Sequence, residues 1–268
     1  MELRLDLNNL YSGCSFSDLL RSSYPSILPS FKFDSPRLEA IVAGIPKGTT
    51  ILATKYKGGV IMGGDRRATE GYLISSRRIE KVFKADSFSL VGIAGAAGPC
   101  LEMVRLFQTE LEHYEKLEGT TLTLEGKANK LAQMVHQNLP AAIQGLVVIP
   151  IFAGYDNSSG QGRIFKYDIT GGRYEEEEYY ATGSGGKDAR STLKKRYHAD
   201  MSESEAIEII LEALFDAAEE DIGTGGPDSI RDIYPNVKLV TSNGMLEVPT
   251  DRIKSLYQKL IGTMKGRG

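Results

Sequence analysis

The order of strand-like and helical segments constrains the fold more than any other feature of this sequence. After residue 48, short β-branched runs separated by glycine are followed by two segments with helical spacing, then by further strand-like runs, two more helices, a hairpin and a last helix. Elements that come in blocks, rather than in strict strand–helix alternation, favour antiparallel sheets covered by helices. The sequence therefore predicts a layered α+β fold, with 49–268 as one domain.

Hydrophobic periodicity and turn signals place the individual elements. TTILATKY and VIMGGD, separated by KGG, have the pattern of a hairpin, and Asn243-Gly244 indicates a second hairpin turn. Tyr174–Thr182 is expected to be a single strand. The other expected strands are 72–76, 79–84, 87–94, LVVIPIFAGYD and GRIFKYDIT. Helices are expected from Pro99, around 131–139, over 186–197, after the capping box of Ser202 and Glu205, and over 251–262.

Residues 1–48 differ from the rest of the chain. They hold eight serines and four of the ten prolines, and they show no sustained periodicity. Such a composition cannot bury enough apolar surface to offset the entropy of ordering. We therefore expect a flexible leader in front of the domain.

Composition excludes several classes of protein. With 32 Lys and Arg against 35 Asp and Glu, the net charge is −3, so no overall basic field attracts nucleic acid or an anionic membrane. The longest apolar run, Leu146–Ala153, is much shorter than the ~20 residues of a membrane-spanning helix, and the N-terminus lacks a secretory signal. Cys14 and Cys100 lie far apart and outside any metal-binding motif, which indicates neither a disulfide framework nor a metal site and favours the reducing cytoplasm.

The usual catalytic motifs do not fit either. Gly183–Asp188 is close to a phosphate-binding loop but lacks the upstream glycine and the hydroxyl residue after the lysine. The three histidines, His113, His136 and His198, lie apart and outside any hydrolase signature. A hydrolase with this sequence must therefore take its base from elsewhere.

A chain terminus is one such base, because an α-amine titrates near pH 8 and accepts a proton at neutral pH. The Gly48-Thr49-Thr50 boundary joins the leader to the first strand, and cleavage after Gly48 would leave Thr49 with a free amine beside its hydroxyl. Taken alone, a Gly-Thr-Thr sequence is common and indicates no more than the start of a strand. Its meaning depends on the motifs that follow.

Those motifs occur together and in order. GGVIMGGDRRAT contains Asp65, RRIEKVFKAD contains Lys81, and GIAGAAG contains Gly95; HYEKLEG, ATGSG and DIGTGGPD come further along. Over essentially all of 49–268 the chain resembles the β subunit of the proteasome core particle, most closely the actinobacterial type. The resemblance implies a four-layer αββα sandwich of two antiparallel sheets, the fold of N-terminal nucleophile hydrolases. It also implies that residues 1–48 are a propeptide removed on maturation.

The resemblance implies a role for each matching residue. Thr49 would supply the nucleophilic hydroxyl and, after processing, the amine that activates it. Lys81 would be a buried ammonium beside them, since a nearby cation disfavours the protonated amine and favours alkoxide-like charge. Asp65 would hold that ammonium, which would otherwise be an unpaired buried charge.

Further residues match the family's supporting groups. The Gly95 N–H would face the developing oxyanion. Ser184 and Asp221 would hydrogen-bond near the terminal amine and help to pass its proton to the leaving group. Thr224 stands where many relatives have serine and keeps the hydroxyl, and Arg67 would order the loop after Asp65.

The resemblance also implies how substrate binds. Substrate backbone would pair as an added strand with Thr69 and with the segment at Gly95 and Ala97, so one apolar pocket would set a preference for cleavage after hydrophobic residues. The residues expected to line that pocket are Ala68, Ile79, Phe83, Ile93, Ala97 and Cys100.

For partners, the resemblance implies proteasome α subunits, other β subunits in seven-membered rings stacked as α7β7β7α7, a ring-shaped ATPase unfoldase and unfolded polypeptide substrates. It implies no metal or organic cofactor. Three alternatives stay open: a peptidase of the shorter HslV type, a catalytically silent β-type scaffold, and a small-amide hydrolase with the same N-terminal chemistry. The set of Thr49, Asp65, Lys81, Ser184 and Asp221 disfavours the scaffold, which has no physical need for all five.

Overall fold

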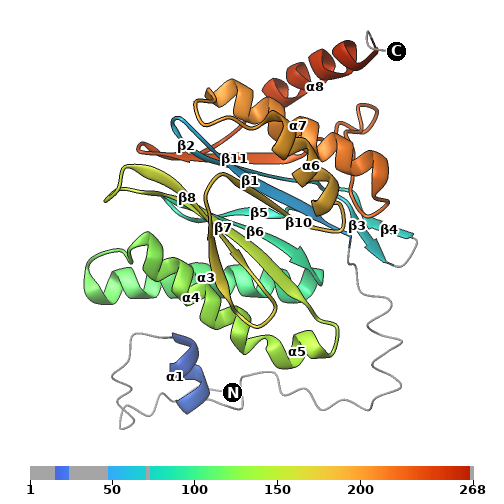
Figure 1. Ribbon diagram of the computed structural model, residues 1–268. Helices are drawn as coiled ribbons and strands as arrows, with labels where there is room; N and C mark the ends of the chain where they lie inside the picture. Colours follow the sequence, from blue (N-terminus) through green and yellow to red (C-terminus); the bar gives the residue numbers. More distant parts are fainter. Residues whose placement is uncertain (1–15, 24–47, 71–72, 266–268) are drawn as a thin grey trace.

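Two five-stranded antiparallel sheets form the centre of the molecule (Figure 1). The computed structural model describes residues 16–23, 48–70 and 73–265. The first sheet has the order β10 (Tyr179–Gly183), β1 (Thr50–Tyr56), β2 (Gly59–Gly64), β11 (Asn236–Thr241), β12 (Gly244–Glu247). The second has the order β5 (Val82–Asp86), β6 (Ser89–Gly95), β7 (Val148–Asp156), β8 (Gln161–Tyr167), β9 (Arg173–Glu176). A short hairpin of β3 (Ala68–Glu70) and β4 (Leu73–Ser76) extends beside them.

Helices cover the outer face of each sheet, so the layers run helix, sheet, sheet, helix (Figure 1). The helices over the first sheet are α6 (Gly186–Arg196), α7 (Glu203–Glu220) and α8 (Thr250–Lys265). Those next to the second sheet are α3 (Ala97–Glu118), α4 (Leu124–Gln137) and α5 (Leu139–Ile143). This is the predicted four-layer α+β sandwich. Within the described ranges, none of the helices has the length and apolar character needed to cross a bilayer.

Alternating side chains of the strands build three apolar cores. On β1, Leu52 faces the core under α6 and α7, while Ile51 and Ala53 face the core between the two sheets. Phe152 of β7 belongs to the third core, under α3 and α4. A strand that is buried on both faces has no polar face to show, which is why ILA at the start of β1 reads as an unbroken apolar run. This burial fixes β1, and with it the position of Thr49 at its entrance.

The structure corrects several expected boundaries. The expected strand over Tyr174–Thr182 is two strands, because the chain turns at 177–178 and passes from the second sheet to the first. The expected strand at 79–84 is shifted to 82–86, and the first long helix begins at Ala97, two residues before Pro99. Leu139 starts the separate helix α5. In the second hairpin, Thr241 pairs with Gly244, so the turn residues are 242–243.

The leader is described only in part. Phe16–Ser23 forms a helix, α1, that was not expected from the sequence, and it lies against α3. Its apolar residues Phe16, Leu19 and Leu20 have helical spacing, but the segment is too short for periodicity to distinguish it from chance. The expected flexibility of the rest of the leader lies outside the described residues.

Candidate active site

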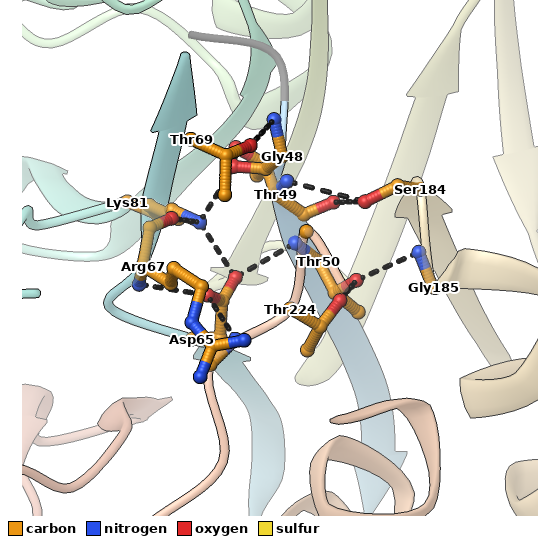
Figure 2. A network of polar contacts seen from close by, with 12 residues as sticks. Gly48, Thr49, Thr50, Asp65, Arg67, Thr69, Lys81, Ser184, Gly185 and Thr224 are labelled. Atoms are coloured by element: carbon orange, nitrogen blue, oxygen red, sulfur yellow. Dashed lines mark hydrogen bonds and ion pairs between the residues drawn. The ribbon is translucent and has the colours of Figure 1, made fainter. Parts of the chain in front are cut away.

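Thr49 lies immediately before β1, where the leader enters the domain, and only 6% of it is exposed. Figure 2 shows the polar groups that surround it. Its carbonyl oxygen accepts a hydrogen bond from the Ser184 N–H at 2.8 Å. Its hydroxyl donates to the Gly48 carbonyl oxygen at 2.6 Å. The hydroxyl is therefore already directed at the peptide group that precedes it.

Asp65 and Lys81 form a buried ion pair beside Thr49. Lys81 Nζ is 2.6 Å from Asp65 Oδ1, and the two side chains are 4% and 0% exposed. The carboxylate also accepts backbone N–H groups, from Thr50 on Oδ1 and from Arg67 and Gly225 on Oδ2, each at 2.8 Å. Because every lone-pair direction is used, Asp65 is held rigidly and can fix the ammonium.

The Lys81 ammonium reaches the bond between leader and domain. It donates to the Gly48 carbonyl oxygen at 3.2 Å and to the Arg67 carbonyl oxygen at 2.5 Å (Figure 2). Burial lowers the pKa of Lys81, and the charge and hydrogen bond of Asp65 oppose that shift. The group thus combines a fixed position with a proton that is easier to remove than that of a solvated lysine.

A second group of polar side chains approaches Thr49 from the turn between β10 and α6 and from the segment after α7. The Thr49 backbone N–H donates to Ser184 Oγ at 3.3 Å, and Ser184 Oγ donates to Asp221 Oδ2 at 2.5 Å. Thr224 Oγ1 donates to the same carboxylate oxygen at 2.5 Å. Ser184 and Asp221, far apart in sequence, therefore meet on the amine side of Thr49.

Glycines allow the segments around Thr49 to approach so closely. Gly183 has φ +100°, and a Cβ there would lie 1.9 Å from the Thr49 carbonyl oxygen. A Cβ on Gly223 would lie 2.8 Å from Gly48 Cα and 2.8 Å from Ser184 Oγ. The glycines of ATGSG and DIGTGGPD are thus needed for packing at the site, a role that the sequence analysis did not assign to them.

The Gly95 N–H points toward the same region. Ile93 donates its N–H to the Lys81 carbonyl oxygen at 3.0 Å. N–H groups two residues apart on a strand point to the same side, so the Gly95 N–H also points toward the β5 edge of β6. Because β5 begins only at Val82, this N–H is directed at the pocket that Gly95 and Thr49 both line. This position fits the oxyanion role expected for Gly95.

That pocket is narrow, about 20 Å³, and five of the six residues expected to line it do so. They are Ala68, Ile79, Ile93, Ala97 and Cys100. Phe83 does not: it lies on the opposite face of β5 from Val82 and packs against the core under α3 and α4. Ile93 and Cys100 of the pocket wall belong to that same core, so Phe83 lies beside the wall without forming part of it. Glu80 and Leu101 line the pocket unexpectedly, and the Glu80 carboxylate pairs with Lys238.

Thr69 and Arg67 are placed beside the leader and the loop. Thr69 Oγ1 accepts the Gly48 N–H at 3.2 Å, and the main-chain pairing of Thr69 with substrate stays a prediction. Arg67 Nη1 donates to the Ile222 carbonyl oxygen at 3.0 Å, which links the loop after β2 to the segment after α7. Among the described residues, no group of three or more His, Cys, Asp or Glu side chains could hold a metal ion.

A four-layer αββα sandwich with a threonine at the entrance of a central strand, next to a buried lysine, defines the class of N-terminal nucleophile hydrolases. The comparisons narrow this class to one family. The model of the family described as Proteasome subunit matches residues 45–232. The chain belongs to the proteasome subunit family, as the sequence motifs predicted.

Curated relatives are similar over most of the chain. A protein named Proteasome subunit beta from Acidimicrobium ferrooxidans is 55% identical over 226 residues, which is 84% of this chain and 83% of the relative. The protein of the same name from Acidothermus cellulolyticus is 51% identical over 255 residues, 92% of this chain and 86% of the relative. That from Frankia casuarinae is 51% identical over 247 residues, 92% and 89% respectively.

Proposed function

We propose that the chain is the precursor of a proteasome β subunit that removes residues 1–48 by its own chemistry and then acts as a threonine endopeptidase. The enzyme class follows from the family and from the three β-subunit relatives. One observation carries the self-cleavage: the Thr49 hydroxyl and the Lys81 ammonium both bind the Gly48 carbonyl oxygen. The processed domain would be 49–268.

Processing starts with attack of Thr49 Oγ1 on the Gly48 carbonyl carbon. The new C–O bond replaces the Gly48–Thr49 C–N bond, and the hydroxyl proton ends on the Thr49 nitrogen, so the amide becomes an ester without any co-reactant. The Lys81 ammonium, 3.2 Å from the carbonyl oxygen, stabilises the negative charge that develops there. Water then hydrolyses the ester, which releases the leader as an acid and frees both the hydroxyl and the amine of Thr49.

The same groups then act on substrate. The free amine takes the proton from Thr49 Oγ1 as the hydroxyl attacks and gives it to the leaving amine, so an ester to Thr49 replaces the peptide C–N bond. Water then hydrolyses the ester, which releases the acid product and restores the Thr49 hydroxyl. The contacts of the free amine are prepared, since the Thr49 nitrogen already lies 3.3 Å from Ser184 Oγ, which is held by Asp221. Lys81 disfavours protonation of the amine, and the Gly95 N–H receives the oxyanion.

Substrate side chains are selected by the pocket beside Thr49. Its walls include Ala68, Ile79, Ile93 and Ala97 and are mostly apolar, which supports a preference for cleavage after hydrophobic residues. The pocket is also lined by Gly48. The end of the leader therefore occupies the position that a substrate's carbonyl group would take.

The family supports assembly with α subunits in a proteasome. We extend this to seven-membered β rings in an α7β7β7α7 particle, fed with unfolded polypeptide by a ring-shaped ATPase in the cytoplasm. Enclosure in such a chamber suits the chemistry, because an exposed unspecific protease would degrade its own surroundings.

Intact-mass measurement after co-expression with the α subunit tests the proposal. We expect loss of residues 1–48, an N-terminal Thr49 and hydrolysis of hydrophobic peptides; Thr49→Ala should abolish both processing and hydrolysis. A Thr49→Ala chain that matures by itself and cleaves peptides would overturn the mechanism. Retention of the full length by the unmodified chain would favour the silent scaffold.

A further inference from the structure

Thr50, the residue after the nucleophile, is completely buried and is part of the polar network (Figure 2). Its hydroxyl oxygen lies 2.6 Å from Thr224 Oγ1 and accepts the Gly185 N–H at 3.0 Å. Its backbone N–H donates to Asp65 Oδ1 at 2.8 Å. Neither the family resemblance nor the sequence motifs assigned this side chain a role.

The direction of the Thr50–Thr224 hydrogen bond follows from counting protons. A hydroxyl has one proton to donate, and an ionised carboxylate only accepts. Thr224 gives its proton to Asp221 at 2.5 Å, so Thr224 must accept from Thr50. The hydroxyls therefore form an ordered chain in which Thr50 donates to Thr224 and Thr224 donates to the Asp221 carboxylate.

The same count fixes the orientation of Ser184. Its oxygen lies 2.5 Å from Asp221 Oδ2 and 3.3 Å from the Thr49 carbonyl oxygen, and it has one proton for the two. The much shorter contact, to a charged acceptor, takes the proton. Ser184 then has only lone pairs to offer the Thr49 nitrogen, which donates to it at 3.3 Å.

We infer that Thr50 is a positioning residue: its side chain holds in place the groups that contact the Thr49 amine. Its hydroxyl holds Thr224, and Thr224 in turn holds the Asp221 carboxylate. With the carboxylate in this position, Ser184 donates its proton to Asp221 and accepts a hydrogen bond from the Thr49 amine. Through its backbone N–H the same residue contacts Asp65, so Thr50 joins the Asp65–Lys81 pair to the Ser184–Asp221 pair. The inference rests on the proposed function, because the amine is free only after processing.

Replacement by valine separates shape from hydrogen bonding. Thr50→Val keeps the volume but leaves the Gly185 N–H and Thr224 without their Thr50 contacts, while Thr50→Ser keeps the hydroxyl. We expect Thr50→Val to lower kcat about 10-fold with little change in KM, and to slow maturation, whereas Thr50→Ser keeps most of both. Thr224→Val should have a similar effect, and the double variant should be little worse than either single one, because the two residues act through one chain of bonds.

The pH dependence of kcat/KM distinguishes a positioning role from a merely structural one, because a loss of stability alone would leave it unchanged. The charged groups around the amine are Lys81, Asp65, Arg67 and Asp221, and none of them changes in Thr50→Val. When the carboxylate is no longer held, Ser184 can turn its proton away from Asp221, and the protonated Thr49 amine loses the hydrogen bond that it donates to Ser184. Loss of that bond destabilises the charged amine and lowers its pKa. The acid limb of kcat/KM should therefore move to lower pH in Thr50→Val and stay in place in Thr50→Ser.

Thr54 on the same strand gives the matched control. It is also completely buried, but its hydroxyl contacts only the backbone carbonyl oxygens of Lys55 and Glu178, at 3.3 and 3.5 Å. Thr54→Val should lower thermal stability without changing kcat or the pH profile. If Thr50→Val and Thr54→Val behave alike, or if Thr50→Ser fails to preserve activity, the inference is wrong. If the unmodified chain itself neither matures nor hydrolyses peptide, the proposed function fails instead.

Discussion

The Lys81 ammonium donates a hydrogen bond to the Gly48 carbonyl oxygen at 3.2 Å, and this carbonyl belongs to the peptide bond that joins the leader to the domain. Asp65 holds the ammonium in that position from the other side, at 2.6 Å. In the proposed mechanism, the cation stabilises charge on the Gly48 carbonyl group during processing and afterwards lies beside the free amine of Thr49.

The first prediction concerns this cation. Lys81→Met should slow the release of residues 1–48 on the order of 10²–10³-fold, because it removes a charged donor from the developing oxyanion. Lys127→Met is the control: Lys127 is also buried and paired, with Asp86 at 2.6 Å, but lies on α4 away from Thr49. Intact mass followed over time should show maturation of the control and the persistent precursor of Lys81→Met. Equal rates in the two variants would contradict the role of Lys81.

The second prediction concerns packing at the leader. Gly223→Ala would place a Cβ 2.8 Å from Gly48 Cα and from Ser184 Oγ, so the chain must shift. Displacing reacting atoms by about 1 Å costs on the order of 10²-fold in rate, and we expect a loss of this size in maturation. Gly262→Ala on α8 meets nothing within 4 Å and should mature normally while gaining roughly 0.5–1 kcal/mol of helix stability. Normal maturation of Gly223→Ala would show that the close approach is not required.

The third prediction uses the pH dependence of Cys100. Burial raises the pKa of its thiol from 9.0 to about 12. The raised pKa keeps the thiol protonated, so at pH 8 the thiolate fraction is on the order of 10⁻⁴ and alkylation should be ~10³-fold slower than in the urea-unfolded chain. Reactivity of the folded protein should rise about tenfold per pH unit up to about pH 12, whereas that of the unfolded chain should level off above about pH 9. Peptide mapping after iodoacetamide treatment measures this, and rapid labelling of the folded protein at pH 8 would show that the pocket does not bury Cys100.

The fourth prediction concerns selectivity. Ala97 lines the narrow pocket beside Thr49, so Ala97→Val should reduce the space for a substrate side chain. Overpacking of this kind costs about 1–3 kcal/mol, so kcat/KM should fall at least ~5-fold for fluorogenic peptides cut after tyrosine. Peptides cut after alanine are the internal control and should be cleaved at the original rate. An equal loss for both substrates would place Ala97 outside the selective pocket.

The sequence predicted most of the fold because its periodicities are local. The capping box of Ser202 and Glu205 starts α7 as expected, and the hairpin of β1 and β2 forms as its glycines indicated. The split at 177–178 was missed because it depends on which sheet each half joins. Periodicity contains no information about that choice.

Some residues of the candidate site could also be predicted from the sequence, and others could not. Thr49, Asp65 and Lys81 could be selected because motifs of a known family contain them, and the structure brings them together. Thr50 could not be selected, since its function depends on Thr224, 174 residues away in sequence. Phe83 was assigned to the pocket wrongly, because family resemblance does not show which side chains of a core reach the pocket wall.

The placement of Gly48 has a consequence for the timing of activity. Since Gly48 itself lines the pocket beside Thr49, a subunit that still carries its leader has no room for another chain there. In the proposed mechanism, the first bond that each copy cuts is its own Gly48–Thr49 bond, and the same cleavage opens the pocket to substrate. A pool of newly made subunits would therefore be harmless to the cell without any separate inhibitor.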